Sequence, residues 1–172
     1  ASGHIHTWAR PMFRQLTALL GFVLLTAAAG AIGGLASVNA ATFYAALDRP
    51  TWAPPAWLFG PVWTVLYTFM AVAAWLVWRV RGWDHAASAL WLYAVHLVVN
   101  ALWSWLFFAW QLGFWAFFGS VALWLMVGAT AASFWSYRRL AALLLLPYWA
   151  WVTFATVLSW SLWQRNPALL GI

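Results

Sequence analysis

The sequence contains no cysteine, and its only carboxylate side chains are those of Asp48 and Asp84. Without cysteine the chain can form no disulfide, no thiolate metal site and no cysteine nucleophile. Both aspartates fall outside the apolar stretches, so no buried carboxylate pair is available for ordinary hydrolytic chemistry. Charged residues of all kinds make up only 6% of the chain. A soluble domain needs far more charge to cover its surface, which excludes a water-soluble fold.

Apolar residues dominate instead and make up 67% of the 172 residues. Five apolar stretches each reach the length of about 20 residues that a helix needs to cross a bilayer. Backbone groups in lipid must be satisfied within the segment, so each stretch is expected to be helical. We therefore predict an all-α integral membrane protein, a five-transmembrane-helix bundle forming a single membrane domain over residues 1–172. The predicted helices span about 14–37, 58–80, 86–109, 114–136 and 139–163.

The connection at about 38–57 is longer than the others and contains Pro50, Pro54 and Pro55. Proline fixes φ and removes a backbone donor, so this connection should be stiff. Long loops in compact proteins are usually functional, which favours a lid over the mouth of a cavity. A rigid interfacial loop anchored by Trp52 and Trp57 is the alternative, and the composition does not choose between them.

All eight positively charged side chains counted at neutral pH are arginines at the ends of apolar runs, singly or in pairs. They form no basic stripe, so the net charge of +6 does not indicate nucleic-acid binding. An alternating topology puts six arginines on one side and two on the other, and the positive-inside rule then makes the N-terminus cytoplasmic in a bacterial inner membrane. The two groups are Arg10, Arg14, Arg79, Arg81, Arg138 and Arg139 against Arg49 and Arg165.

The first apolar run, 16–38, follows two arginines and could be mistaken for a signal peptide. The apolar core of a signal peptide has roughly 7–15 residues, and this run is longer, so we expect a retained membrane helix. Within it, Gly30 and Gly34 form a small-xxx-small pair that lets helices approach closely. Such a pair can serve a contact within the chain or between two copies.

Two predicted helices carry polar or aromatic side chains on one face. Trp63 and Tyr67 are four residues apart and share a face. A second helical face carries His96, Asn100, Trp103 and Phe107. A polar side chain deep in a span, such as Asn100, usually faces the bundle interior. There it can border a pocket or make an interhelical hydrogen bond. His96 has no second ligand at a suitable spacing, so no metal site is predicted.

The last predicted helix contains Pro147, which should kink the helix or disrupt it locally. The next residues form a stripe of Tyr148, Trp151, Ala155 and Leu158. A large aromatic side chain beside a small one leaves concave space that suits a flat ligand. Close helix packing around Ala155 is the alternative.

The chain has 18 tryptophans, far more than membrane-interface belts require. Belts account for residues such as Trp8, Trp83 and Trp163, but a second group falls well inside the spans. Flat indole rings stack on other π-systems and add about 0.5–1.5 kcal/mol per pair beyond burial. These rings therefore predict a pocket for a planar, hydrophobic ligand. The inner group is Trp63, Trp103, Trp124 and Trp151.

Four segments in a fixed order carry a family resemblance. They are Trp52-Ala53-Pro54-Pro55, Pro61-Val62-Trp63-Thr64-Val65-Leu66-Tyr67, Asn100-Ala101-Leu102-Trp103-Ser104, and Pro147-Tyr148-Trp149-Ala150-Trp151 with Phe154-Ala155-Thr156. Together they resemble the tryptophan-rich sensory protein family, also called TspO or translocator protein. The order and spacing agree from about residue 16 to residue 167.

The resemblance implies a five-helix bundle, commonly a homodimer, whose first loop closes over a ligand pocket. Family ligands include protoporphyrin, haem, sterols in some members and synthetic benzodiazepine-type drugs; no obligatory cofactor and no metal are implied. Tyr44, Trp52 and Pro54 would belong to the lid. Carried over by position, the pocket residues are Trp63, Tyr67, Asn100, Trp103, Ser120, Trp151, Ala155 and Leu158.

One departure from the family bears on the ligand. Members linked to sterol binding carry a tyrosine late in the last helix, where this sequence has Trp160 ahead of Arg165. That motif is a weak pattern even when intact, but its absence favours a tetrapyrrole, such as protoporphyrin IX or haem, over a sterol. The implied function is a receptor or sensor with a role in tetrapyrrole transport, regulation or stress response.

Two other functions remain open at this point. The resemblance also implies light-driven degradation of protoporphyrin, as in some family members, which would make the protein a photo-oxidative enzyme with Trp63 and Trp151 as its redox participants. The surplus tryptophans also fit an accessory subunit of a larger membrane pigment–protein complex. The sequence favours a binding protein over an enzyme, because it offers few side chains that could act as a general acid or base within the spans.

Overall fold

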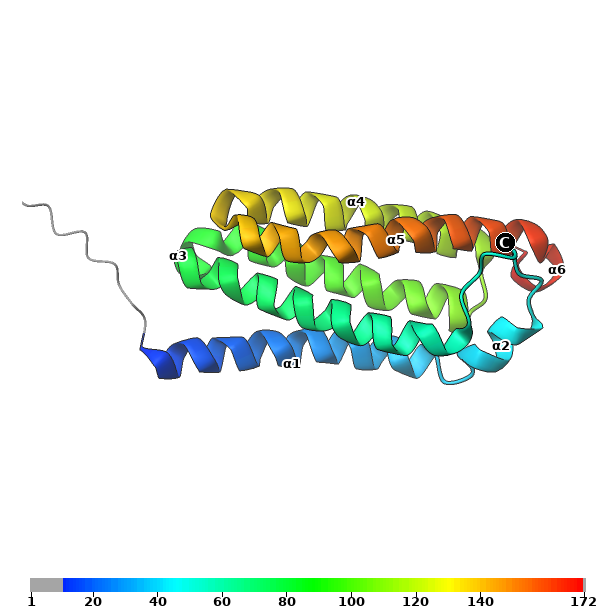
Figure 1. Ribbon diagram of the computed structural model, residues 1–172, viewed down its shortest axis with the longest axis horizontal. Coiled ribbons are helices and arrows are strands. Elements are labelled where there is room, and N and C mark those ends of the chain that lie inside the picture. Colours follow the sequence, from blue (N-terminus) through cyan, green and yellow to red (C-terminus); the bar gives the residue numbers. More distant parts are fainter. Residues whose placement is uncertain (1–10, 172) are drawn as a thin grey trace, which may run out of the picture.

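The computed structural model describes residues 11–171, and every regular element in that range is helical. The long helices are α1 (Met12–Ala36), α3 (Phe59–Ser104), α4 (Gly113–Tyr137) and α5 (Arg139–Arg165). Figure 1 shows them side by side along the long axis of the molecule. The short elements are α2 (Ala40–Ala46), α6 (Pro167–Leu170), the 3-10 turn η1 (Ala56–Leu58) and the π-helical turn η2 (Trp105–Ala109).

α3 reverses direction at Gly82 and forms a hairpin of two arms. Gly82 has φ 71° and Ala86 has φ −118°, so the helical geometry is interrupted at these two residues. A left-handed φ is readily adopted by glycine, which has no Cβ. The sequence predicted two separate helices here, at 58–80 and 86–109, whereas the structure joins them in one helical element. In Figure 1 the two arms run antiparallel, with the turn at the end opposite α2.

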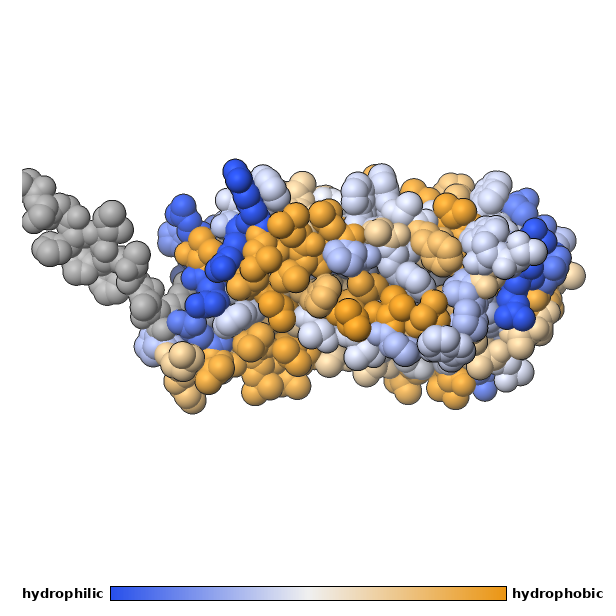
Figure 2. Space-filling model, in the orientation of Figure 1, coloured by the Kyte–Doolittle hydropathy of each residue, from blue (hydrophilic) through white to orange (hydrophobic). Residues whose placement is uncertain are grey.

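The outer surface is that of a membrane protein. The helices α1, α4 and α5 and the continuous helical stretch Ala56–Ala109 are long and apolar enough to cross a bilayer. Many large apolar side chains point outward, such as Phe13, which is 80% exposed. Figure 2 shows apolar residues over much of this face, with hydrophilic side chains gathered at the two ends. Lipid, rather than water, must cover the middle of this molecule.

The arginines group at the two ends of the bundle. Arg14 opens α1, Arg79 and Arg81 precede the α3 turn, and Arg138 forms the turn between α4 and α5. The two turns lie together, because the Tyr137 hydroxyl donates to a backbone carbonyl of the α3 turn at 3.2 Å. Arg10 and Trp8, which the sequence analysis used, lie outside the described residues.

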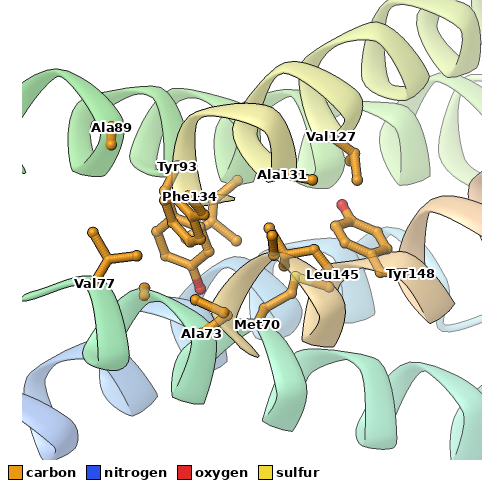
Figure 3. Packing of buried hydrophobic residues seen from close by; sticks show 14 of the residues in the cluster. Met70, Ala73, Val77, Ala89, Tyr93, Val127, Ala131, Phe134, Leu145 and Tyr148 are labelled. Atoms are coloured by element: carbon orange, nitrogen blue, oxygen red, sulfur yellow. The ribbon is translucent and has the colours of Figure 1, made fainter. Parts of the chain in front are cut away.

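The core lies between both arms of α3, α4 and α5. Figure 3 shows Met70 and Tyr93 from the two arms packed with Phe134 of α4 and Tyr148 of α5. Each of these four side chains is fully buried. This core fixes the relative positions of the helices that border the cavity described below.

α1 packs against α3 through glycines. A Cβ at Gly30 would lie 3.1 Å from the Tyr67 ring, and a Cβ at Gly33 would lie 3.1 Å from Ser104 Oγ. A Cβ at Gly34 would have no neighbour within 4 Å. The close approach therefore uses Gly30 and Gly33 and occurs within the chain. The predicted partner position, Gly34, faces open space.

Two expectations about local structure change. The stretch 38–57 is not all loop, because residues 40–46 form α2. Four of those seven residues are alanines, two on each side of Thr42, Phe43 and Tyr44, and alanine is the best helix former. The helix ends before the first proline of the segment. Pro147 does not end or interrupt α5, which runs through it from Arg139 to Arg165.

Candidate ligand cavity

A cavity of about 400 Å³ lies at the end of the bundle that carries α2 and η1. Its walls come from α1, α2, both ends of α3 with η2, and α5. The residues predicted for the pocket or its lid that line it are Trp63, Tyr67, Trp103, Trp151, Ala155, Leu158 and Tyr44. The structure thus brings together side chains from helices that are distant in the sequence.

The other predicted residues lie nearby but do not line the cavity. Asn100 is buried beneath Tyr67, and Ser120 is buried on α4, where its hydroxyl donates to the Phe117 carbonyl at 2.6 Å. Ser120 does not line the cavity, because none of the lining residues comes from α4. Trp52 and Pro54 belong to the covering segment.

Aromatic rings form a continuous path from the covering segment into the cavity. Trp52 packs edge-on against Phe154 with ring centroids 5.8 Å apart, and Phe154 lies 5.4 Å from Trp151. Trp151 in turn lies 5.9 Å from Phe59. On the α3 side, Trp63 lies 5.5 Å from the ring of Tyr67. Edge-to-face and offset contacts at these distances are the arrangements that aromatic rings prefer.

A glycine-rich wall of α1 faces the aromatic side chains. Gly30, Gly33 and Gly34 all line the cavity, and each is a position without a side chain. Sequence reasoning treated two of them as a packing seam and did not predict that they border a ligand site. Phe59 also lines the cavity and was not predicted, and Phe107 was placed on the face of Asn100 and Trp103 but not among the pocket residues. The small residues at 27–34 were the sequence feature from which this cavity wall could have been predicted.

A buried hydrogen-bond network lies directly behind the cavity wall. Tyr67 donates its hydroxyl to Asn100 Oδ1 at 2.8 Å, and Asn100 Nδ2 donates to the Tyr148 hydroxyl at 2.7 Å. His96 Nδ1 lies 2.6 Å from the Tyr93 carbonyl, which can only accept, so Nδ1 carries the proton. His96 Nε2 must then accept from the Tyr148 hydroxyl, at 3.1 Å.

This network occupies both ring nitrogens of His96, so neither is free to bind a metal. Among residues 11–171, no group of three histidine or aspartate side chains is close enough to hold a metal ion. The network instead holds the Tyr67 ring in position as part of the cavity wall.

The segment over the cavity is fixed by specific contacts. The Tyr44 hydroxyl donates to the Pro54 carbonyl at 2.6 Å, and the Arg49 guanidinium lies 4.8 Å above the Tyr44 ring. Burial raises the pKa of Tyr44 above its usual value, and the nearby charge of Arg49 offsets part of that rise. Tyr44 is therefore a neutral hydroxyl donor at physiological pH. The contacts make the segment a structured cover.

The cover is also tied to the end of α5. Asn166 Oδ1 accepts from the Asp48 backbone N–H at 2.8 Å, and Asn166 Nδ2 donates to the Asp48 carbonyl at 2.9 Å. Arg165 lies 3.8 Å from the Asp48 carboxylate, with both side chains exposed. The sequence analysis did not single out Asn166, because its role depends on a contact between distant parts of the chain.

Fold and site together define a helical membrane protein with an aromatic cavity covered at one end by a structured segment. The chain belongs to the TspO/MBR family, whose profile matches residues 22–164. The resemblance found in the sequence motifs is thereby confirmed.

Individual relatives come from bacteria and animals. The chain is 38% identical to Protein CrtK of Rhodobacter capsulatus over 157 residues, which cover 89% of this chain and 95% of the relative. It is 42% identical to the Translocator protein of Ovis aries over 130 residues, covering 72% and 75% of the two chains. It is 36% identical to the Tryptophan-rich sensory protein of Cereibacter sphaeroides over 124 residues, covering 72% and 77%.

Proposed function

We propose that this protein is a receptor or sensor that binds a planar hydrophobic ligand, of the tetrapyrrole class, in the cavity between its helices. The observation that carries the proposal is a cavity of about 400 Å³ walled by Trp63, Trp103 and Trp151. Small-molecule sites typically enclose roughly 300–1,000 Å³ and are lined by apolar and aromatic side chains. Protoporphyrin IX and haem are large, flat and mostly apolar. A role in transport, regulation or stress response agrees with the names of the sensory and translocator relatives.

The shape of the lining favours a flat ligand over a bulky one. Gly34 faces open space, and Ala155 adds a small side chain on the α5 side. A planar ring system could lie between these small residues and the indoles of Trp63 and Trp151. Stacking on each indole would add about 0.5–1.5 kcal/mol beyond burial. A sterol lacks a π-system and would gain no such stacking, so it ranks below a tetrapyrrole.

We also infer the orientation of the protein. Both arms of α3 are taken to cross the membrane, which gives five crossings with α1, α4 and α5. The end that carries Arg14, Arg81 and Arg138 faces the cytoplasm of a bacterial inner membrane by the positive-inside rule. The covered cavity then opens toward the opposite side. Two such chains are expected to form a homodimer, as the family resemblance implies.

A titration of the purified protein with protoporphyrin IX, followed by tryptophan quenching, tests the binding site. Ala155→Phe puts a ring into the cavity and should weaken binding at least about tenfold, a loss of about 1.4 kcal/mol. Ala150→Phe is the matched control, because Ala150 is exposed on the same helix and does not line the cavity. Its affinity should equal that of the parent protein. Quenching that does not saturate, or equal affinities of the two variants, would refute the proposal.

Photo-oxidative degradation of the bound pigment is a second candidate function. Trp63 and Trp151, the two predicted redox participants, both line the cavity and would lie against the ligand. Illumination of the protein–protoporphyrin complex should then bleach the pigment faster than illumination of free protoporphyrin. The double variant Trp63→Phe and Trp151→Phe should slow bleaching while it still binds pigment in the dark. Equal bleaching by parent and variant would remove this candidate and leave the binding proposal intact.

A further inference from the structure

A second hollow, of about 470 Å³, lies between α4 and α5 and shares no residue with the ligand cavity. It is lined only by apolar side chains, alanines and a glycine from these two helices. Several of its lining residues are exposed, such as Leu125 at 59% and Leu143 at 48%. The hollow is therefore a groove on the surface that faces lipid.

The deep end of the groove is a preformed aromatic wall. Trp124 and Trp149 stack with ring centroids 5.0 Å apart and an interplanar angle of 25°. Both indole N–H groups are satisfied, one by Thr153 Oγ1 at 2.7 Å and one by the Trp124 carbonyl at 3.0 Å. Gly128 makes room for the stack, since a Cβ there would lie 3.2 Å from Trp149 Nε1. The wall thus presents only apolar surface to the groove.

The other end of the groove meets the arginines of the α4–α5 turn. Trp135 lines the groove, and the Arg139 guanidinium lies 5.1 Å above its ring. Arg138 is the neighbouring turn residue, and both arginines are exposed. Within residues 11–171 neither arginine forms an ion pair, since the ion pair found there joins Arg165 and Asp48 at the opposite end. Two positive charges without an ion pair among the described residues therefore lie next to the Trp135 end of the groove, Arg139 through its contact with Trp135 and Arg138 as its neighbour in the turn.

The length of the groove matches one leaflet of a bilayer. Trp124 and Trp135 mark its two ends and are 11 residues apart on α4. At 1.5 Å per residue this separation is about 16 Å, roughly half of a hydrocarbon core about 30 Å thick. A single acyl chain that starts at the arginines would reach the tryptophan stack near the middle of the membrane.

We propose that this groove is a binding site for one anionic phospholipid, with an acyl chain along α4 and α5 and the headgroup phosphate on Arg138 and Arg139. Arginine pairs phosphate oxygens through two parallel hydrogen bonds, and basic residues beside transmembrane helices select anionic headgroups. A zwitterionic lipid could fill the groove and offer its phosphate to the arginines, but its own cationic group would oppose that pairing, so its net charge would neutralise neither arginine. The site lies apart from the ligand cavity and does not depend on the function proposed above.

Native mass spectrometry of the full chain, with dioleoyl phosphatidylglycerol or dioleoyl phosphatidylcholine added in detergent, tests the charge requirement. One phosphatidylglycerol should be retained about tenfold more strongly than phosphatidylcholine. Arg138→Gln with Arg139→Gln should abolish this preference. Arg79→Gln is the matched control, because Arg79 lies 4.6 Å above Trp75 in a similar cation–π contact and does not border the groove. It should keep the preference. Equal retention of both lipids, or equal losses in both variants, would overturn the proposal.

A second pair of variants tests the groove itself. Ala129→Leu with Ala132→Leu fills the groove with side chains that suit a lipid-facing helix, and phosphatidylglycerol retention should fall about tenfold. Ala122→Leu changes an exposed position on α4 outside the groove and should have no effect. Unchanged retention in the filled variant would overturn the proposal. So would a filled variant that shifts the monomer–dimer ratio and leaves lipid retention intact, since the groove would then be an interface between copies.

Discussion

The side-chain amide of Asn166 hydrogen-bonds both the backbone N–H and the backbone carbonyl of Asp48, 118 residues away in the sequence. Asn166 Nδ2 also donates to the Leu162 carbonyl at 2.8 Å, so one side chain caps the end of α5 and holds the cavity cover. The cover is therefore fixed by backbone contacts that substitutions in the cover itself would largely preserve.

Asn166→Ala should destabilise the protein by about 1–3 kcal/mol, because it leaves two backbone groups of Asp48 without their partner. Thermal unfolding in detergent measures the loss, and hydrogen exchange at residues 47–58 should become faster. Arg165→Gln removes an exposed ion pair and an exposed hydrogen bond to Ser161 and should cost less than about 1 kcal/mol. Equal effects of the two substitutions would mean that the amide is not what holds the cover.

The buried network behind the cavity should show strong coupling between Tyr67 and Asn100. Asn100→Ala leaves the Tyr67 hydroxyl without its acceptor and removes one donor to the Tyr148 hydroxyl, which keeps its contact with His96, and should cost about 1–3 kcal/mol. The double variant with Tyr67→Phe should deviate from additivity by about 0.5–3 kcal/mol in unfolding free energy, measured by SDS titration in mixed micelles. Asn100→Ala combined with Tyr137→Phe, at the far end of the bundle, should be additive. Additivity in both pairs would argue against the network.

The two glycines of the small-xxx-small pair should respond differently to alanine. Gly34→Ala meets open space and should be neutral or stabilise by up to about 1 kcal/mol, because alanine favours helix. Gly30→Ala brings a Cβ to 3.1 Å from a Tyr67 ring that Asn100 holds in place, so it should destabilise, by about 1–3 kcal/mol. Thermal unfolding compares them. If the order were reversed, α1 would pack on α3 through a different face.

Haem and metal-free protoporphyrin IX should bind with similar affinity. Both ring nitrogens of His96 are engaged, so the histidine buried nearest the cavity has no lone pair to offer iron. Parallel quenching titrations measure the two affinities, and the absorption spectrum of bound haem reports any histidine ligand. Much tighter binding of haem, lost in His96→Gln, would contradict the hydrogen-bond assignment.

Much of the fold follows from the length and hydrophobicity of the apolar runs, which can be read from the sequence. Long apolar runs must be helical in lipid, so α1, α4 and α5 begin and end within three residues of the predicted bounds. The structure differs where local chemistry decides. Gly82 adopts a left-handed φ and lets the chain reverse between two directly connected helical arms, and the alanines around Tyr44 make a helix of part of the predicted loop.

The cavity could be predicted only in part, because helix faces are visible in a sequence and helix neighbours are not. The stripe of Tyr148, Trp151, Ala155 and Leu158 was predicted from its spacing, and the last three line the cavity, whereas Tyr148 is buried in the core. Ser120 was predicted as a pocket residue from the family resemblance alone, and it lies on α4, which contributes no residue to the cavity lining. The homodimer, the photo-oxidative activity and a place in a larger pigment complex stay predictions.

The turn at Gly82 also determines at which end of the bundle the last long helix finishes. A single residue with φ 71° sends the second arm of α3 back through the bundle, so α1 begins at one end and α5 finishes at the other (Figure 1). With both arms of α3 crossing the membrane, as proposed above, a reporter fused after α5 and one fused before α1 would sit in different compartments. Because the cavity cover and Asn166 share the C-terminal end, a C-terminal fusion would sit beside the ligand site, and an N-terminal one would leave it clear.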